Sequence, residues 1–590
     1  MVVLLAVLVV LVLLAVLAVP VASAAVVGGA IDAVASVATV ASAAAAASTV
    51  SGADPSSPAQ EAAASATSNA DPNLDPNLAG APTHRSVGSG RRRGTAAHGV
   101  AVVTFAGCEL TTWWLVEHVT ITPRDPFRFA AVVGDERAAE FTDEAAEVVR
   151  TLLHGRSVIN VNSTAAGGGV AEMLHVLLGY IRGLGIDAQW LVVDGNPDFF
   201  AVTKRLHNHL YGTPGDGGPL GETAHEIYRT VQHSQFDGLA LHARAGDVVV
   251  LHDPQTAGLA EPAKRLGCKV VWRCHVGVDE QNECSREGWD FLRPYLDGYV
   301  DEYVFSDRRF PPDWVPQDHL SVIWPSIDPF APKNQPLEEA TIEAILTHVG
   351  LIAGRKGDTV FERTDGTPGR VERMCDIVRT GPPPAPDVPL VVQVSRWDTM
   401  KDMGGVMAAF AEFIDSGRNA ELVLAGPVVS AVADDPEGGQ VLMDCFNQWR
   451  QLPHAARSRV HLVCLPMHDL EENAVIVNAL QRHAAVVTQK SLAEGFGLTA
   501  AEAMLKGTPV VASAVGGLID QVIDGESGYL VKDPHDLEEF GRAVCRILDD
   551  DDLRRRLGEG ARARAVETHL GDTHLLRWGD VIRRLEEVPT

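Results

Sequence analysis

Short apolar runs alternate with helix-length segments through most of this 590-residue chain, and this alternation limits its fold more than any other feature. Residues 157–162 indicate a buried strand, residues 163–169 a glycine-rich loop, residues 170–184 an amphipathic helix and residues 189–193 the next strand. Such an order of elements is a βαβ unit, whose strands lie parallel in one sheet. Further strands of this series are predicted at residues 248–251, 269–273, 302–305 and 321–323, and a helix at residues 144–154 precedes it after a linker.

A second series of strands follows the charged and proline-containing segment 336–386, which we predict to be a linker with an insertion. Its strands are predicted at residues 389–394, 421–425, 459–464, 485–488, 510–512 and 528–531. We therefore predict an α/β protein with two Rossmann-like, doubly wound domains at residues 96–335 and 387–555, and a helical tail at residues 556–590. Ligands of such sheets bind outside the carboxyl ends of the strands, so a cleft between the two domains is the expected site.

Composition excludes several classes of partner. The formal net charge of −28 argues against nucleic acid and against an anionic membrane surface. The eight cysteines are scattered and form no C-x-x-C pair, which indicates reduced thiols and a cytoplasmic catalytic domain.

The first 95 residues form a separate leader. Residues 1–19 are an unbroken apolar run that is long enough to span a bilayer, and Ala22-Ser23-Ala24 resembles a signal cleavage site. The first Lys or Arg is Arg85, however, so the usual positive start of a signal is missing. Residues 25–80 have the composition of a disordered linker. For residues 1–24 a signal, a membrane anchor, another kind of leader and a start codon placed too far upstream all stay open.

Two carboxylates eight positions apart mark the strongest candidate site. Glu494 precedes the turn Phe496-Gly497-Leu498, and Glu502 lies about two turns into the Ala-rich helix that begins there. The free N–H groups and positive dipole end of that helix suit a diphosphate. The two glutamates can then hold different hydroxyls of one sugar nucleotide, although a pair of solvated glutamates is the simpler alternative.

Basic side chains follow the first strand of the second series. Arg396 and Lys401 come directly after residues 389–394, where they can contact phosphate oxygens in the cleft. A salt bridge with Asp398 or Asp402 is the structural alternative.

Further candidates lie in the first series. His252 and Asp253 follow one predicted strand, and His275 follows the next, which indicates a site rather than two core histidines. Gly168 and Gly169 belong to a Gly-Gly-Gly loop that would let backbone N–H groups approach an anion, with a plain turn as the alternative.

Together these motifs resemble the retaining glycosyltransferases of family 4, which have the GT-B fold, and within them the trehalose synthase and trehalose phosphorylase group. The resemblance covers about residues 155–540. It is carried by VNSTAAGGGVAEML (161–174), NPDFF (196–200), TKRLHN (203–208), LHDPQTAGL (251–259), WRCH (272–275), SRWDTMKD (395–402) and QKSLAEGFGLTAAEAMLKGTPVVASAVGG (489–517).

The resemblance implies a role for each candidate. Arg396, Lys401, Glu494 and His275 would be catalytic. The donor would be bound by Gly168, Gly169, Arg396, Lys401, Phe496, Gly497, Leu498 and Glu502, with Glu502 on the ribose. Glucose and the acceptor would contact His252, Asp253 and Glu494.

The implied reaction is retaining glucosyl transfer from UDP- or ADP-glucose to glucose, giving trehalose. Two alternatives stay open: a retaining trehalose phosphorylase, and a non-catalytic regulator that binds a sugar nucleotide. The expected partners are the nucleotide sugar and glucose, with no metal, no cofactor and no nucleic acid. The oligomeric state stays open, a homodimer included.

Overall fold

The computed structural model describes residues 116–165, 168–414, 417–429 and 437–587. The expectations for the leader at residues 1–95 lie outside these residues. Within the described part of the chain, no helix is both long and apolar enough to cross a membrane.

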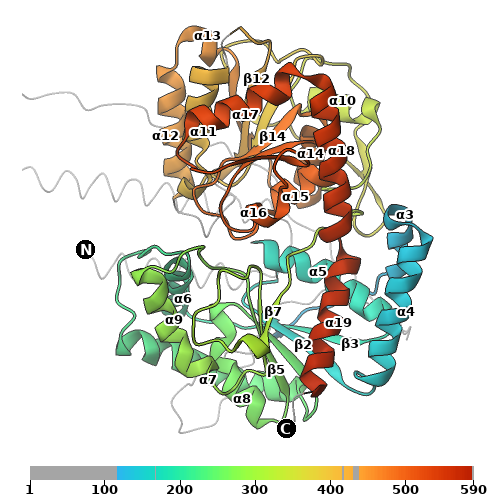
Figure 1. Ribbon diagram of the computed structural model, residues 1–590, viewed down its shortest axis with the longest axis vertical. Helices are drawn as coiled ribbons and strands as arrows, with labels where there is room; N and C mark the ends of the chain where they lie inside the picture. Colours follow the sequence, from blue (N-terminus) through green and yellow to red (C-terminus); the bar gives the residue numbers. More distant parts are fainter. Residues whose placement is uncertain (1–115, 166–167, 415–416, 430–436, 588–590) are drawn as a thin grey trace, which may run out of the picture. The chain divides into compact units, whose positions relative to one another are not determined.

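The first sheet has seven strands in the order β1-β3-β2-β4-β5-β6-β7, and all pairs are parallel except β1 with β3 (Figure 1). Its strands are β1 (Glu117–His118), β2 (Ser157–Asn162), β3 (Asp187–Val192), β4 (Val248–His252), β5 (Lys269–Cys274), β6 (Glu302–Phe305) and β7 (Leu320–Val322). The predicted strands of the first series are confirmed to within two residues at each end.

Helices cover both faces of this sheet. Successive side chains of a strand point to opposite faces, and both sets are apolar here, so both faces must be covered. On one face, Val249 and Leu251 pack toward α6 (Pro197–Leu210), α7 (Glu222–His242), α8 (Ala260–Arg265) and α9 (Glu283–Leu296). On the other face, Val248 and Val250 pack with residues of α4 (Asp135–Thr151) and α19 (Gly571–Glu587), and α5 (Gly168–Gly183) covers β3.

The start of α4 corrects one expectation. The helix predicted at residues 144–154 begins at Asp135 instead, within the supposed linker. Its first half is charged and weakly periodic, but Ala138 and Phe141 are buried. Burial against the rest of the fold therefore decides where this helix begins.

The second sheet also has seven strands, in the order β10-β13-β12-β11-β14-β15-β16, and only β10 is antiparallel to its neighbour. Its strands are β10 (Asp376–Val378), β11 (Leu390–Val394), β12 (Glu421–Pro427), β13 (Val460–Leu465), β14 (Val486–Gln489), β15 (Val510–Ser513) and β16 (Gly528–Val531). Among its helices are α11 (Met403–Ala409), α12 (Gly438–Gln451), α14 (Leu470–His483), α15 (Leu498–Leu505), α17 (Leu537–Asp549) and α18 (Asp551–Thr568).

The segment 336–386 is more than a connection. It contains α10 (Glu339–His348) and the hairpin of β8 (Val360–Glu362) and β9 (Pro368–Arg370), and its strand β10 joins the edge of the second sheet. Three-residue strands are too short to show an alternating pattern, which is why the sequence did not reveal them.

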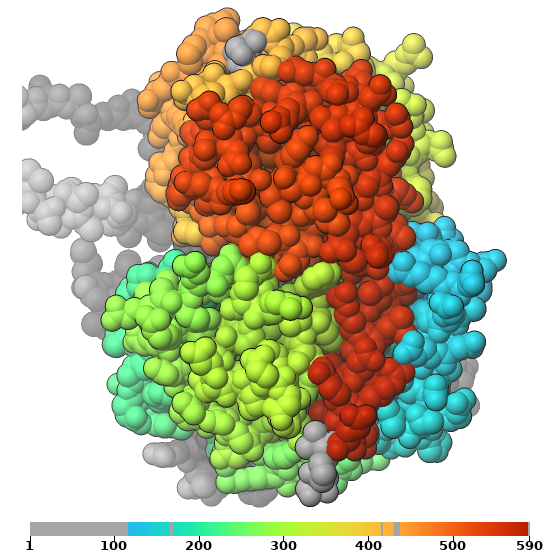
Figure 2. Space-filling model, in the orientation of Figure 1, coloured from blue at the N-terminus to red at the C-terminus, as the bar shows by residue number. Residues whose placement is uncertain are grey.

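The end of the chain connects the two halves. Helix α18 packs against α15, and α19 then packs against α4 on the first sheet. Figures 1 and 2 show α19 lying alongside α4. The seven cysteines of the described residues are all free thiols.

Candidate active site

The loop between β14 and α15 presents Glu494. Gly497 ends this loop with φ 90° at the N-terminus of α15, a conformation in which a Cβ atom would be strained. A Cβ atom on Gly516 would lie 1.7 Å from the carbonyl oxygen of Glu494, so only glycine allows these two loops to pack. Both glycines therefore fix the backbone that positions Glu494.

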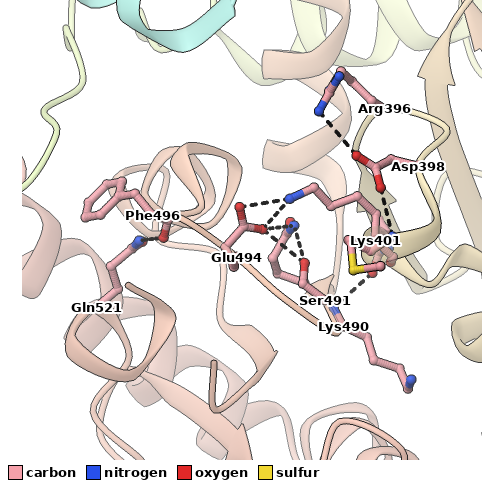
Figure 3. Close-up of polar contacts among 11 residues, drawn as sticks. Arg396, Asp398, Lys401, Lys490, Ser491, Glu494, Phe496 and Gln521 are labelled. Carbon is pink, nitrogen blue, oxygen red and sulfur yellow. Dashed lines mark hydrogen bonds and ion pairs between the residues drawn. The ribbon is translucent and has the colours of Figure 1, made fainter. Parts of the chain in front are cut away.

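Lys401 and Glu494 form a direct ion pair, with Nζ 2.8 and 2.7 Å from the two carboxylate oxygens (Figure 3). Ser491 Oγ and Gln489 Nε2 donate further hydrogen bonds to Glu494 Oε2, at 3.0 and 3.1 Å. Strands β11 and β14 are neighbours, so the loops that follow them carry these residues to the same place. Two predicted site residues are thus in contact, and Lys401 pairs with neither of the aspartates that the sequence suggested as structural partners.

A second lysine supports this loop and was missed by the sequence analysis. Lys490 is fully buried and forms an ion pair with Asp402, which has φ 46° and accepts a hydrogen bond from Gly405 N at the start of α11. Gln393 Nε2 donates to the carbonyl of Lys401 at 2.7 Å. Lys490 and Gln393 therefore fix the backbone at Lys401 and Asp402, which positions the side chain of Lys401.

Arg396 lies apart from that pair, beside Asp398 (Figure 3). Its Nη2 donates to Asp398 Oδ2 at 3.2 Å, and its side chain is 56% exposed. Asp398 also caps the short helix after it by accepting from Met400 N. Arg396 thus has the salt bridge expected as the alternative, while its exposed guanidinium can still reach an anion.

Glu502 lies within α15 and is almost fully buried. Lys333 Nζ is 3.4 Å from its carboxylate and 3.2 Å from that of Glu172 on α5. Burial raises the pKa of Glu502, and the nearby Lys333 and Lys506 lower it. Lys333 was not anticipated, because it lies in the connection after β7, where no sequence pattern marks it.

His252 is the last residue of β4 and His275 directly follows β5, and the two lie side by side because these strands are neighbours. The rings of His252 and His275 are stacked with centroids 5.5 Å apart, and His252 Nδ1 is 3.2 Å from His275 Nε2. The other nitrogen of His252 is 3.0 Å from Asn160 Oδ1 on β2. Since an amide oxygen only accepts, His252 Nε2 carries the proton and His275 Nε2–H donates to His252 Nδ1. Burial lowers the pKa of both histidines, so both are neutral.

Asp253 has a strained backbone, with φ 61° and ψ 179°. Its carboxylate accepts a hydrogen bond from the backbone N–H of His275 at 2.8 Å. Burial raises the pKa of this carboxyl to about 7, opposed by the hydrogen bond and by Arg273. Strain of this kind is concentrated at functional sites, where the surrounding structure maintains it.

This strain predicts an unusual order of stabilities. We expect Asp253→Gly to be more stable than Asp253→Ala by about 1 kcal/mol or more, because only glycine adopts this conformation freely. At ordinary positions the order is reversed, with glycine about 0.5–1 kcal/mol less stable. Urea unfolding of both variants measures the difference. Equal stabilities, or a more stable alanine variant, would show that the backbone at Asp253 is not strained.

Several predicted residues of the two sheets meet in one place. A Cβ atom on Gly169, in the first turn of α5, would lie 3.0 Å from Leu498, which begins α15. A Cβ atom on Gly495 would lie 3.4 Å from the carbonyl oxygen of His275. The N-terminal ends of α5 and α15, with their free N–H groups, therefore approach each other where an anion is expected.

Two further side chains at the end of α6 join this group. Tyr211 Oη would be 3.0 Å from a Cβ atom on Gly495, and burial raises the pKa of Tyr211, as do Glu494 and Asp253. Burial lowers the pKa of His207 to about 4, as do Lys204 and Arg396. The sequence analysis missed Tyr211 and His207, although the glycines that follow Tyr211 mark the end of this helix.

This geometry combines cations for an anionic leaving group with carboxylates and neutral histidines for hydroxyl groups. In particular, Lys401 and Glu494 place a positive charge and a hydrogen-bond acceptor within one contact. Such a site can stabilise the departure of a phosphate from a sugar while holding the sugar by its hydroxyls.

Two family models match the chain. Residues 160–312 match the N-terminal domain of trehalose synthase, and residues 379–564 match the group 1 glycosyl transferases. Trehalose synthase of Pyrococcus horikoshii is 32% identical over 459 residues, which are 78% of this chain and 95% of that protein. The chain belongs to the trehalose synthase family. It is therefore a glycosyltransferase enzyme.

Other relatives agree with membership of the trehalose synthase family. Trehalose synthase of Rubrobacter xylanophilus is 32% identical, covering 69% of this chain and 85% of that protein. Trehalose phosphorylase of Grifola frondosa is 26% identical, covering 70% of this chain but only 54% of that longer protein.

Solved structures confirm the predicted fold class. Sucrose-phosphate synthase of Thermosynechococcus elongatus aligns with a TM-score of 0.51 at 19% identity, covering 73% of this chain and all of that one. A trehalose-6-phosphate protein of E. coli, bound with UDP-2-fluoro glucose, aligns with a TM-score of 0.53 at 13% identity, covering 72% and 99%. This member of the trehalose synthase family thus has the two-sheet GT-B fold.

Proposed function

We propose that this enzyme makes trehalose by transferring glucose, with retention, from a nucleotide-diphosphate glucose to glucose. The observation that carries the proposal is the contact between Lys401 and Glu494. It places a cation for the leaving phosphate next to a carboxylate for the hydroxyls of the transferred sugar. The trehalose synthases of Pyrococcus and Rubrobacter, at 32% identity, support the choice of product.

The proposed chemistry depends on the leaving group. Arg396 and Lys401 neutralise the charge that develops on the diphosphate as the bond to the anomeric carbon breaks. The N–H groups at the starts of α5 and α15, including those of Gly168, Gly169 and Leu498, add to this stabilisation. No metal or other cofactor takes part in this scheme.

The acceptor glucose attacks from the side on which the phosphate leaves. The new bond forms between its anomeric oxygen and the anomeric carbon of the donor, and the departing phosphate oxygen takes the proton of the attacking hydroxyl. Asp253 and His275 would contact the acceptor, since they lie together at the ends of β4 and β5. His252 would hold the ring of His275 in position, because its two ring nitrogens pair with His275 and Asn160. In this scheme Glu502 binds the ribose of the nucleotide.

Trehalose phosphorolysis is the second candidate. The same cations would bind inorganic phosphate, and the relative from Grifola frondosa supports it at lower identity. This chain spans about half the length of that relative. In this case no nucleoside would need Glu502.

An assay of products separates these candidates. We expect purified protein to form α,α-trehalose from glucose and at least one of UDP-, ADP- and GDP-glucose, detected by proton NMR of the anomeric signals. The Lys401→Ala variant, prepared identically, controls for contaminating enzymes. Glucose 1-phosphate formed from trehalose and phosphate, with no reaction of any nucleotide sugar, would establish the phosphorylase instead. A protein that binds nucleotide sugars but forms no product in either assay would be the non-catalytic regulator.

A further inference from the structure

A cavity of about 80 Å³ lies on the face of the first sheet that α4, α5 and α19 cover, and it reaches the candidate active site at His252. Its walls are apolar and come from α4, α5 and α19, including Val148, Leu177 and Ile582. Its floor is polar and comes from the strands and α19, with Asn160, His252, Arg273 and His574. An apolar chamber with a few convergent polar groups is the usual form of a small-molecule site.

Arg273 is the exceptional group on this floor. It is completely buried, and its two Nη atoms donate to the backbone carbonyls of Phe305 at 3.4 Å and Ile323 at 2.5 Å. Its Nε has no hydrogen-bond partner. No carboxylate of the described residues forms an ion pair with it. Asp253 is the acidic group that acts on Arg273, but it forms no ion pair with it, and burial raises the pKa of its own carboxyl to about 7. A buried guanidinium with one N–H unsatisfied carries a desolvation penalty, so a ligand that supplies a negative charge and a hydrogen-bond acceptor would be favoured.

The other polar groups of the floor already have partners. Asn160 pairs with His252, and His574 Nδ1 is 2.8 Å from the carbonyl oxygen of Trp324. Trp578 Nε1 donates to His574 Nε2 at 3.0 Å. Burial lowers the pKa of His252 and of His574 to about 3, so neither competes with Arg273 for an anion. Burial also lowers the pKa of Arg273, to about 9, which leaves it charged at neutral pH.

An exposed ion pair lies at the rim of the cavity. Glu144 on α4 and Arg583 on α19 both line the cavity, and Arg583 Nη2 is 2.9 Å from Glu144 Oε1. Their side chains are 44% and 35% exposed, so the pair lies at the surface where α4 and α19 run side by side (Figure 2). Exposed pairs of this kind are weak, and a small molecule can pass when the pair opens.

We propose that this cavity binds a short aliphatic carboxylate, with its carboxylate on Arg273 and its alkyl chain between α5 and α19. The charge follows from the buried guanidinium, whose Nε has no hydrogen-bond partner and which forms no ion pair with any carboxylate of the described residues. The length follows from the volume, which is smaller than the cavity of about 150 Å³ that holds benzene in a protein core. Butyrate is a suitable probe. His252 borders both this cavity and the proposed acceptor position, but the apolar walls come from α4, α5 and α19, and the proposal does not depend on the proposed reaction.

Calorimetric titration of the full chain with butyrate and with 1-butanol tests the proposal. We expect saturable binding of butyrate and at least about tenfold weaker binding of the alcohol, because only the carboxylate forms charge-assisted hydrogen bonds with Arg273. Equal binding of both would show an apolar cavity without recognition of charge. No binding of butyrate at millimolar concentrations would overturn the proposal.

Two variants locate the binding. Arg273→Met keeps the unbranched stem of the side chain but removes the guanidinium, and it should weaken butyrate at least about tenfold, whereas Leu177→Trp should abolish binding by filling the cavity. Arg584→Met is the matched control, since Arg584 lies on α19 next to the rim but pairs with Glu302 outside the cavity. Butyrate binding that persists in both Arg273→Met and Leu177→Trp would place the ligand elsewhere. The comparison of butyrate with butanol on the unaltered chain still decides the matter if a variant does not fold.

Discussion

Replacement of Arg396 or Lys401 by alanine should lower kcat/KM by at least about 10²-fold, the effect of losing one group that stabilises charge on a leaving group. The two residues occupy different environments, so the effect of each replacement on stability can also be predicted. Arg396 is exposed, so its loss should change stability by no more than about 1 kcal/mol. Loss of Lys401 leaves Glu494 with the donors Ser491 and Gln489, so the loop keeps part of its support.

Arg542 provides the matched control for Arg396. Both side chains are 56% exposed, and each pairs with a nearby carboxylate, but Arg542 lies on α17 and pairs with Glu538. Arg542→Ala should therefore have the kcat/KM of the unaltered enzyme. Steady-state kinetics with the preferred donor measures all three variants. Near-normal values for both Arg396→Ala and Lys401→Ala would remove these residues from the site.

Glu494→Gln and Glu502→Gln should impair different steps: Glu502→Gln the binding of the nucleotide, and Glu494→Gln the turnover. Glu502→Gln should weaken the binding of a free nucleoside diphosphate by about 1–3 kcal/mol, the range for a lost hydrogen bond to a charged group. Glu494→Gln should bind the nucleotide almost normally but turn over slowly, because Glu494 lies with Lys401 where the sugar is expected. Calorimetry with the nucleotide, together with steady-state kinetics, distinguishes the two.

Glu172, the second carboxylate that contacts Lys333, supplies the control for this comparison. Lys333 contacts both Glu502 and Glu172, and the side chain of Glu172 is 55% exposed. Glu172→Gln removes one partner of Lys333 without changing Glu502, so it should leave nucleotide binding near normal. If Glu172→Gln is as harmful as Glu502→Gln, the ion-pair cluster rather than the ribose contact explains the loss. If the unaltered protein binds no nucleotide, the phosphorylase becomes the better proposal and Glu502 is a structural residue.

Much of the fold could be predicted from local patterns. The strands at residues 157–162, 302–305 and 528–531 begin and end where they were expected, because a buried parallel strand must be apolar on both faces. Elements with little apolar periodicity were not predicted correctly. The first half of α4 is charged, and β10 has three residues, so only their packing on the remaining structure defines them.

In the candidate site, too, local patterns identify the residues, but they do not show which residues are in contact. Glycine-containing turns after apolar strands identify the Glu494 loop, and basic residues after β11 identify Arg396 and Lys401, since both signals lie within a few positions of a strand end. The contact of Lys401 with Glu494 joins residues 93 positions apart. It exists because β11 and β14 are neighbours in the sheet, and strand order depends on the packing of the whole chain.

By itself, then, the sequence determined the class of fold, most of the strands and the residue types that can bind a phosphate and a sugar. Only the tertiary structure decided which of them touch. It placed Asn160 beside His252 because β2 adjoins β4, and it brought Lys333 to Glu502 through a connection without any recognisable pattern. It also buried the guanidinium of Arg273 with no carboxylate of the described residues in ion-pair contact. The physical reason is that local patterns depend on neighbours in the chain, whereas buried charges and hydrogen bonds are satisfied by groups that are close only in the folded molecule.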